Sequence, residues 1–105
     1  MERHVLKILP EYFQEVWDGK KTFELRKDDR NYNVGDILVL REYTNGYTGN
    51  TIEVVVTHIL RNCTKYGLAD GYCILSIKRH SDLNAEKVYK QRLKSVTKYI
   101  CEVDA

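Results

Sequence analysis

Three charged side chains that could bind a ligand or carry out acid–base chemistry lie close together near the start of the chain. They are Lys21, Glu24 and Arg26. A lysine supplies a point charge for phosphate, whereas an arginine can fork onto a phosphate or the edge of a base. A glutamate can accept from an exocyclic amine or hold a neighbouring arginine in place. This combination is suited to an anionic ligand that contains a base.

Alternation of apolar and charged residues predicts a strand over residues 21–27. Phe23 and Leu25 fall on one face of that strand, and Glu24 and Arg26 fall on the other. We expect the two apolar side chains to be buried and their replacement by alanine to be costly. We expect Glu24 and Arg26 to project together from the opposite face.

Further candidates for binding flank this strand. Lys21 has the wrong parity for a regular strand, so its direction is left open by the sequence. Lys20 and Arg30 add positive charge that could contact phosphate. Aromatic rings near the predicted loops could stack on bases, and the three tyrosines so placed are Tyr32, Tyr43 and Tyr47.

A strand followed by a short helix is predicted before the charged segment. Residues 4–9 alternate as a strand, and Pro10 suits the first position of a helix over residues 10–18. Gly19 suits the position just after the helix, where a left-handed conformation is favourable. Trp17 is expected to fill the core rather than to stack on a base.

Three further strands are predicted over residues 37–43, 51–60 and 72–78. Four consecutive apolar residues open the first of them, which indicates burial on both faces. His58 is expected on the apolar face of the second, together with Leu60, as a hydrogen-bonded structural residue. Short strands separated by turn residues predict an α+β, mainly β fold, a small β-barrel with helices packed outside.

The segment reads Gly-x-Lys-x-x-Glu-x-Arg from Gly19 to Arg26, which resembles the signature of ASCH domains, a branch of the PUA-like β-barrels. Its surroundings look like one small subfamily of unknown function (DUF3850-like), and the stretches concerned are residues 4–10, 34–36, 38–43 and 67–78. The resemblance covers roughly residues 4–79. It implies a PUA-like barrel with a short helix after the first strand, and RNA binding in the cleft beside the motif.

The resemblance also implies an alternative activity. Some ASCH proteins resemble small amidohydrolases that remove an acetyl group from the amino group of cytidine, using a lysine, a threonine and a glutamate. Here Lys21 matches the lysine, but Glu24 stands where the threonine is expected, and Thr22 does not obviously replace it. Asp70 is the candidate for a second acid. If the chain is an enzyme, Lys21 and Glu24 are its candidate catalytic residues, but the departure favours binding.

Two other interpretations remain open at this point. The motif could hold a small nucleotide-like ligand, with Lys21 and Arg26 on phosphate and Glu24 on a base amine. Alternatively, the three side chains could form only an ion-pair network that closes the mouth of the barrel. Dependence of the affinity on the number of nucleotides would separate a mononucleotide pocket from a site for RNA.

Composition limits the remaining possibilities. The chain has 105 residues and a net charge of +2, which predicts one domain and only local electrostatic attraction for nucleic acid. The histidines and cysteines show no metal-binding spacing, and no apolar run approaches the length of a membrane span. We therefore expect a cytoplasmic protein with no cofactor, no metal and no membrane partner, and the oligomeric state is left open.

The chain divides into a barrel over residues 1–80 and an added segment over residues 81–105. Within the latter, residues 84–100 show helical periodicity with five Lys or Arg against one acid. We expect a basic amphipathic helix packed on the same domain, with a phosphate-contacting face as the alternative.

Overall fold

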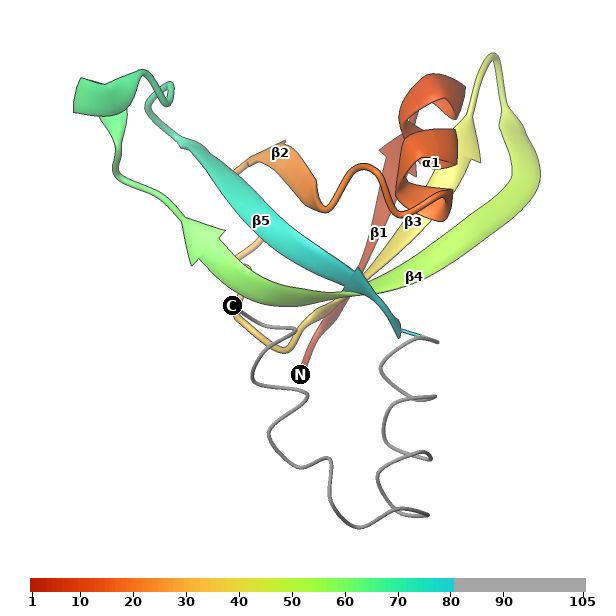
Figure 1. The fold of residues 1–105 in the computed structure, drawn as a ribbon, viewed down its shortest axis with the longest axis horizontal. Coiled ribbons are helices and arrows are strands. Elements are labelled where there is room, and N and C mark those ends of the chain that lie inside the picture. The colour runs from red at the N-terminus through yellow and green to blue at the C-terminus, as the bar shows by residue number, and fades with distance from the viewer. Residues whose placement is uncertain (81–105) are drawn as a thin grey trace, which may run out of the picture.

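The computed structural model describes residues 1–80, which form one curled sheet with a short helix packed against it (Figure 1). The predicted helix over residues 84–100 lies outside the described residues. Among those described, no helix is long and apolar enough to cross a membrane. The elements in chain order are β1 (Arg3–Ile8), α1 (Pro10–Trp17), β2 (Phe23–Lys27), β3 (Ile37–Tyr43), β4 (Tyr47–Leu60), the 3₁₀ helix η1 (Thr64–Tyr66) and β5 (Tyr72–Arg79).

The five strands lie in the order β1-β3-β4-β5-β2. β1 runs parallel to β3, and the other three pairs are antiparallel. The sheet curls into a half-barrel, with η1 at the far end of β4 and β5 from α1 (Figure 1). The mainly β fold is therefore confirmed. Within residues 1–80, however, β1 and β2 remain edge strands rather than closing the barrel by pairing with each other.

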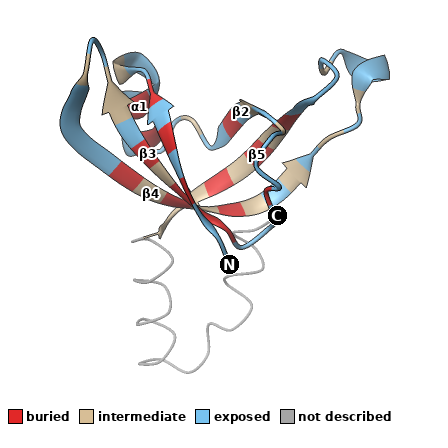
Figure 2. Ribbon diagram, turned by 180° about the vertical axis from the view of Figure 1, so that it is seen from behind, coloured by how far each residue is buried: buried red, intermediate tan, exposed pale blue. Residues whose placement is uncertain are grey.

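Alternating side chains from the strands build the core, and Figure 2 shows the resulting bands of burial along β4 and β5. The predicted burial of both faces at the start of β3 is confirmed, because Ile37, Leu38 and Leu40 are buried and Val39 is half-buried. The core cluster comprises Leu6, Ile8, Phe13, Val16, Tyr32, Leu38, Leu40, Ile52, Val54, Val56, Cys73, Leu75 and Ile77.

The end of α1 sets the path of the chain into β2. Gly19 has φ +76°, the left-handed conformation expected after the helix. Its amide donates to the Val16 carbonyl at 3.1 Å, and the Lys20 amide donates to the Glu15 carbonyl at 2.9 Å. This pair of bonds is the Schellman arrangement, which satisfies the last carbonyls of the helix and reverses the chain.

The expectation that Trp17 fills the core was wrong. Its side chain is half-exposed, stacked on Phe13 at 6.0 Å between ring centroids, and the Arg79 guanidinium lies 4.1 Å from its ring centroid. The buried stripe of α1 consists of Phe13 and Val16, and Trp17 lies at the edge of that stripe. Its large ring therefore covers the side of the core while remaining accessible.

His58 and Leu60 were also expected on the apolar face of β4, and both are exposed. The register with β5 shifts between Val56 and His58, which places a bulge in the strand. One extra residue reverses the side-chain parity beyond it, so Ile59 packs against the core instead.

A buried hydrogen bond between His4 and Asp36 anchors the start of the sheet. His4 Nε2 lies 2.9 Å from Asp36 Oδ2, and Asp36 also accepts from the Glu2 amide at 3.0 Å and the Asn33 amide at 2.9 Å. Burial acts to raise the pKa of Asp36, but these hydrogen bonds outweigh it and lower the pKa below its ordinary value. The carboxylate thus ties β1 to the turn that begins β3.

Candidate functional site

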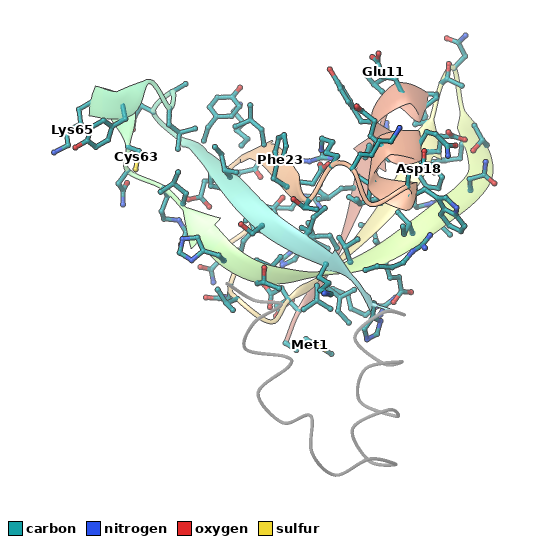
Figure 3. All side chains as sticks on the ribbon, viewed as in Figure 1. Met1, Glu11, Asp18, Phe23, Cys63 and Lys65 are labelled. Carbon is teal, nitrogen blue, oxygen red and sulfur yellow. The ribbon has the colours of Figure 1, made fainter. Side chains whose placement is uncertain are left out.

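A cavity of about 560 Å³ lies where the open edges of β1 and β2 meet α1, and we call it the seam cavity. Phe23 projects between β2 and α1 in Figure 3. Four cationic side chains, two carboxylates and several apolar or aromatic groups surround the cavity. They are Lys7, Ile8, Leu9, Tyr12, Glu15, Lys20, Lys21, Phe23, Glu24, Leu25 and Arg26.

Glu24 is the centre of the polar part of the cavity and is only 3% exposed. One of its carboxylate oxygens accepts from Lys21 Nζ, and the other accepts from Arg26 Nε at 2.8 Å. Lys21 Nζ also donates to the Phe23 carbonyl at 2.7 Å. The structure thus brings together the three side chains that the sequence singled out. Since one carboxylate faces two cations, the three side chains together carry a net positive charge.

The prediction for the two faces of β2 had the correct alternation but the wrong direction. Phe23 and Leu25 are 47% and 55% exposed, whereas Glu24 points to the buried side and Arg26 is half-buried there. Burial of Glu24 is tolerated because two cations compensate its charge through hydrogen bonds. The apolar side chains therefore lie at the rim, where they line the seam cavity.

Arg26 also bridges the two edge strands. Its Nη2 donates to the Lys7 carbonyl of β1 at 2.8 Å while its Nε holds Glu24. Arg30 makes a similar bridge further along, donating to the Val5 carbonyl at 3.1 Å. Arg30, a predicted phosphate ligand, is therefore engaged with the edge of β1 and is not part of the lining of the seam cavity.

Tyr32 was expected to offer a stacking surface, and the structure contradicts this. The residue is 1% exposed, and its ring meets that of His4 edge-on at 4.8 Å. Burial raises the pKa of its phenol, which Arg30 and Arg26 partly oppose. The polar loop folds inward at this point, so Tyr32 completes the core below the loop and cannot receive a base on its ring.

Several residues of the cavity wall were missed by the sequence analysis. Lys7, Tyr12 and Glu15 belong to the exposed faces of β1 and α1, where nothing in the local pattern separates them from ordinary surface residues. An exposed tyrosine beside a charged motif is a weak signal that could have suggested Tyr12. Lys20, which was predicted as a ligand contact, does line the cavity.

Of the residues considered for catalysis, Lys21 and Glu24 are in direct contact, whereas Thr22 and Asp70 lie outside the lining of the seam cavity. Thr22 is exposed and lines a second cavity of about 450 Å³, on the other side of Lys21, together with Trp17 and Arg79. Asp70 lies in the exposed turn before β5 and lines neither cavity. In the part of the chain that the structure describes, there is no group of three or more His, Cys, Asp or Glu that could hold a metal ion.

Comparison with known proteins places the chain in a family. An uncharacterized 12.9 kDa protein in the GpA 3' region of Escherichia phage P2 is 44% identical over 57 residues. The matching region is 53% of this chain and 52% of that relative, so it spans about half the length of each. A family model described as a domain of unknown function, DUF3850, matches residues 3–77. Because this match covers most of the chain, the chain belongs to the DUF3850 family.

Proposed function

We propose that this chain is an ASCH-type, PUA-like domain that binds RNA or a nucleotide-derived ligand in the seam cavity. The observation that carries the proposal is the structure of the cavity itself. Aromatic and apolar walls surround a polar floor on which two cations hold one buried carboxylate. Ligand sites commonly combine apolar walls with a few oriented polar groups, and about 560 Å³ is within their usual size range.

The polar groups suggest how an anionic ligand would be held. Lys20 lines the cavity, is exposed, and can reach a phosphate without giving up a side-chain hydrogen bond within residues 1–80. Arg26 and Lys21 contribute positive charge beside it, held in place by Glu24. Since each oxygen of Glu24 already accepts one hydrogen bond, its main role is to orient these cations. Any bond to a base amine would use the remaining lone pairs.

The apolar walls suggest how a base would be held. Tyr12 and Phe23 present aromatic rings, with Leu9 and Leu25 beside them. Stacking on such rings is tolerant of base identity, because every base has a flat aromatic face. The low net charge of the chain predicts a modest salt dependence, in keeping with a few phosphate contacts rather than a long electrostatic track.

The geometry favours binding over the amidohydrolase alternative. That chemistry uses a threonine hydroxyl, which the resemblance expects at the position of Glu24. Thr22 shares the second cavity with Lys21, but it does not line the seam cavity, where Lys21 Nζ meets Glu24. The other acid considered, Asp70, is outside both cavities. Similarity to the ASCH signature, together with the curled half-barrel, supports the family assignment at the level of fold, but fold alone does not determine activity.

The test is fluorescence anisotropy of labelled single-stranded RNA against the parent protein and two variants, at low and moderate salt. Arg26→Ala removes a cation of the floor, and Lys20→Ala removes an exposed lysine with no structural role that the contacts indicate. Lys65→Ala is the matched control, because it removes the same charge from the tip of the β4–β5 connection (Figure 3). Thermal melting establishes that each variant is folded.

We expect saturable binding that Lys20→Ala weakens several-fold and Arg26→Ala weakens further, with Lys65→Ala close to the parent. Cytidine nucleotides added as competitors distinguish a mononucleotide pocket from a site for RNA. Equal affinity of the parent and both cavity variants would remove the assignment of the site. If the parent does not bind at low salt, the binding proposal is wrong, and release of acetate from acetylated cytidine becomes the next assay.

A further inference from the structure

A second group of basic and aromatic side chains lies beside the seam cavity, on the face of the sheet opposite the core. It consists of Lys7 on β1, Arg41 and Tyr43 on β3, and Tyr47 at the start of β4, and we call it the tyrosine platform. Lys7 and Arg41 are partners in the β1–β3 register, and Tyr43 and Tyr47 are partners across β3 and β4. Strand pairing therefore brings Lys7 beside three residues of β3 and β4 that are far from it in the sequence.

The rings and charges of the platform are in direct contact. The two tyrosine rings meet edge to face, with their centroids 5.1 Å apart. Arg41 Cζ lies 3.8 Å from the centroid of Tyr47, and Lys7 Nζ lies 4.4 Å from that of Tyr43. Tyr47 is half-exposed and Arg41 is exposed, so the outer surface of this arrangement is accessible to a flat ligand.

The cations of the platform have no carboxylate partner among the described residues. Within residues 1–80, neither Lys7 nor Arg41 forms an ion pair, and both lie over aromatic rings instead. The nearest acid on β3, Glu42, accepts from Thr48 and Asn50. Cations without a carboxylate partner among residues 1–80, beside the half-exposed ring of Tyr47, match the needs of single-stranded nucleic acid, in which bases stack and phosphates require positive charge.

Lys7 joins the platform to the seam cavity. Its side chain lies over Tyr43, and the same residue lines the cavity and accepts from Arg26 through its carbonyl. A single-stranded nucleic acid with one base in the cavity can therefore pass Lys7 and place its next base over the tyrosines. The alternative occupant, a mononucleotide, would leave the platform unused.

We propose that the tyrosine platform stacks the nucleotide next to the one held in the seam cavity, so that the preferred ligand is a single strand of at least two nucleotides. This inference rests on the proposed function of the cavity and specifies its ligand. Arg41 and Lys7 contact the phosphates that flank the stacked base, and Tyr47 supplies the exposed ring.

The test compares nucleoside monophosphates with homopolymeric RNA tetranucleotides of the same four bases, each competing with labelled RNA in the anisotropy assay. Tyr47→Ala removes the exposed ring, and Tyr47→Phe keeps it. Tyr66→Ala is the matched control, because Tyr66 is another exposed tyrosine with a lysine, Lys65, 5.1 Å from its ring centroid. It belongs to η1, which lies at the end of the sheet away from α1 (Figure 1).

We expect the parent to prefer tetranucleotides over mononucleotides, and Tyr47→Ala to reduce tetranucleotide affinity roughly tenfold while mononucleotide affinity is unchanged. Tyr47→Phe and Tyr66→Ala should resemble the parent. If Tyr47→Ala leaves the tetranucleotide affinity unchanged while Lys20→Ala still lowers the affinity for all ligands, the proposed role of the platform is wrong and the assignment of the cavity stands. If no probe binds the parent at low salt, both proposals are wrong.

Discussion

Arg26 Nη2 donates to the carbonyl of Lys7 at 2.8 Å, and this bond joins two edge strands that do not pair with each other through their backbones. The same guanidinium holds the buried Glu24 through Nε. One side chain therefore links the closure of the sheet to the orientation of the cavity floor. A lysine could not make both bonds in the same geometry, because its single nitrogen lacks the planar fork of arginine.

Replacement of Arg26 should therefore affect stability as well as binding. Arg26→Ala leaves one oxygen of Glu24 and the Lys7 carbonyl without this donor, and we expect a loss of about 1–3 kcal/mol in the free energy of unfolding. Arg26→Lys should recover part of that loss. Urea denaturation measures the difference, with Arg30→Ala as a control that should cost less, because its bond to Val5 is exposed. Equal stability of Arg26→Ala and the parent would contradict the proposed role.

Because Phe23 and Leu25 lie on the exposed face of β2, replacing them by alanine should cost less stability than the sequence led us to expect. Leu25 is exposed on the edge strand, so Leu25→Ala should cost less than about 1 kcal/mol. Leu75 on β5 is fully buried, so Leu75→Ala should cost about 2–5 kcal/mol. The two variants make the same chemical change, so the difference between their unfolding free energies reports burial directly. A larger loss in Leu25→Ala would mean that the strand faces are not as described.

Much of the fold was predictable because alternation and turn residues are local signals. β1, α1, β3 and β5 occur close to their expected bounds, and Gly19 has the left-handed conformation predicted after the helix. The face of β2 was not predictable from hydrophobicity, because burial of Glu24 depends on Lys21 and Arg26 together compensating one charge. Such compensation is a property of the assembled site rather than of any single residue.

Other errors have similar causes. The bulge after Val56 reverses the side-chain parity of β4, and nothing in the residues around it marks the shift. Tyr32 lies in a polar loop and is nevertheless buried, because its ring packs against His4 from a distant strand. The motif identified the charged floor of the candidate site, whereas Tyr12 and Lys7 join it only through the three-dimensional arrangement of α1 and β1.

Gly19 provides a test of how the helix end positions the cavity lysines. A Cβ at this position would meet no atom within 4 Å, so the cost of substitution comes only from the left-handed backbone. Gly19→Ala should therefore lose about 1–2 kcal/mol in the free energy of unfolding, and Gly19→Asn should lose less, since asparagine tolerates this conformation. Urea denaturation of both variants checks the order. A neutral Gly19→Ala would show that the backbone does not keep φ +76° in solution.

The lowered pKa of Asp36 predicts how the free energy of unfolding changes at acid pH. Its pKa is lowered in the folded state, because the amides of Glu2 and Asn33 and the His4 ring outweigh the effect of burial. A carboxyl group with a depressed folded pKa stabilises the protein fully above its unfolded pKa of about 4. That contribution is lost as the pH falls through the folded value, since protonation removes the charge that the hydrogen bonds favour.

We therefore expect Asp36→Asn to be less stable than the parent near neutral pH, and the difference to shrink below about pH 4. Unfolding free energies from urea denaturation at several pH values measure this convergence. Glu53→Gln is the control, because the pKa of Glu53 is also lowered, chiefly by its hydrogen bond from Arg3, but at an exposed site. Its effect should have the same sign and be smaller, since solvent screens exposed pairs. A parent–Asp36→Asn difference that stays constant across this range would contradict the role assigned to the buried carboxylate.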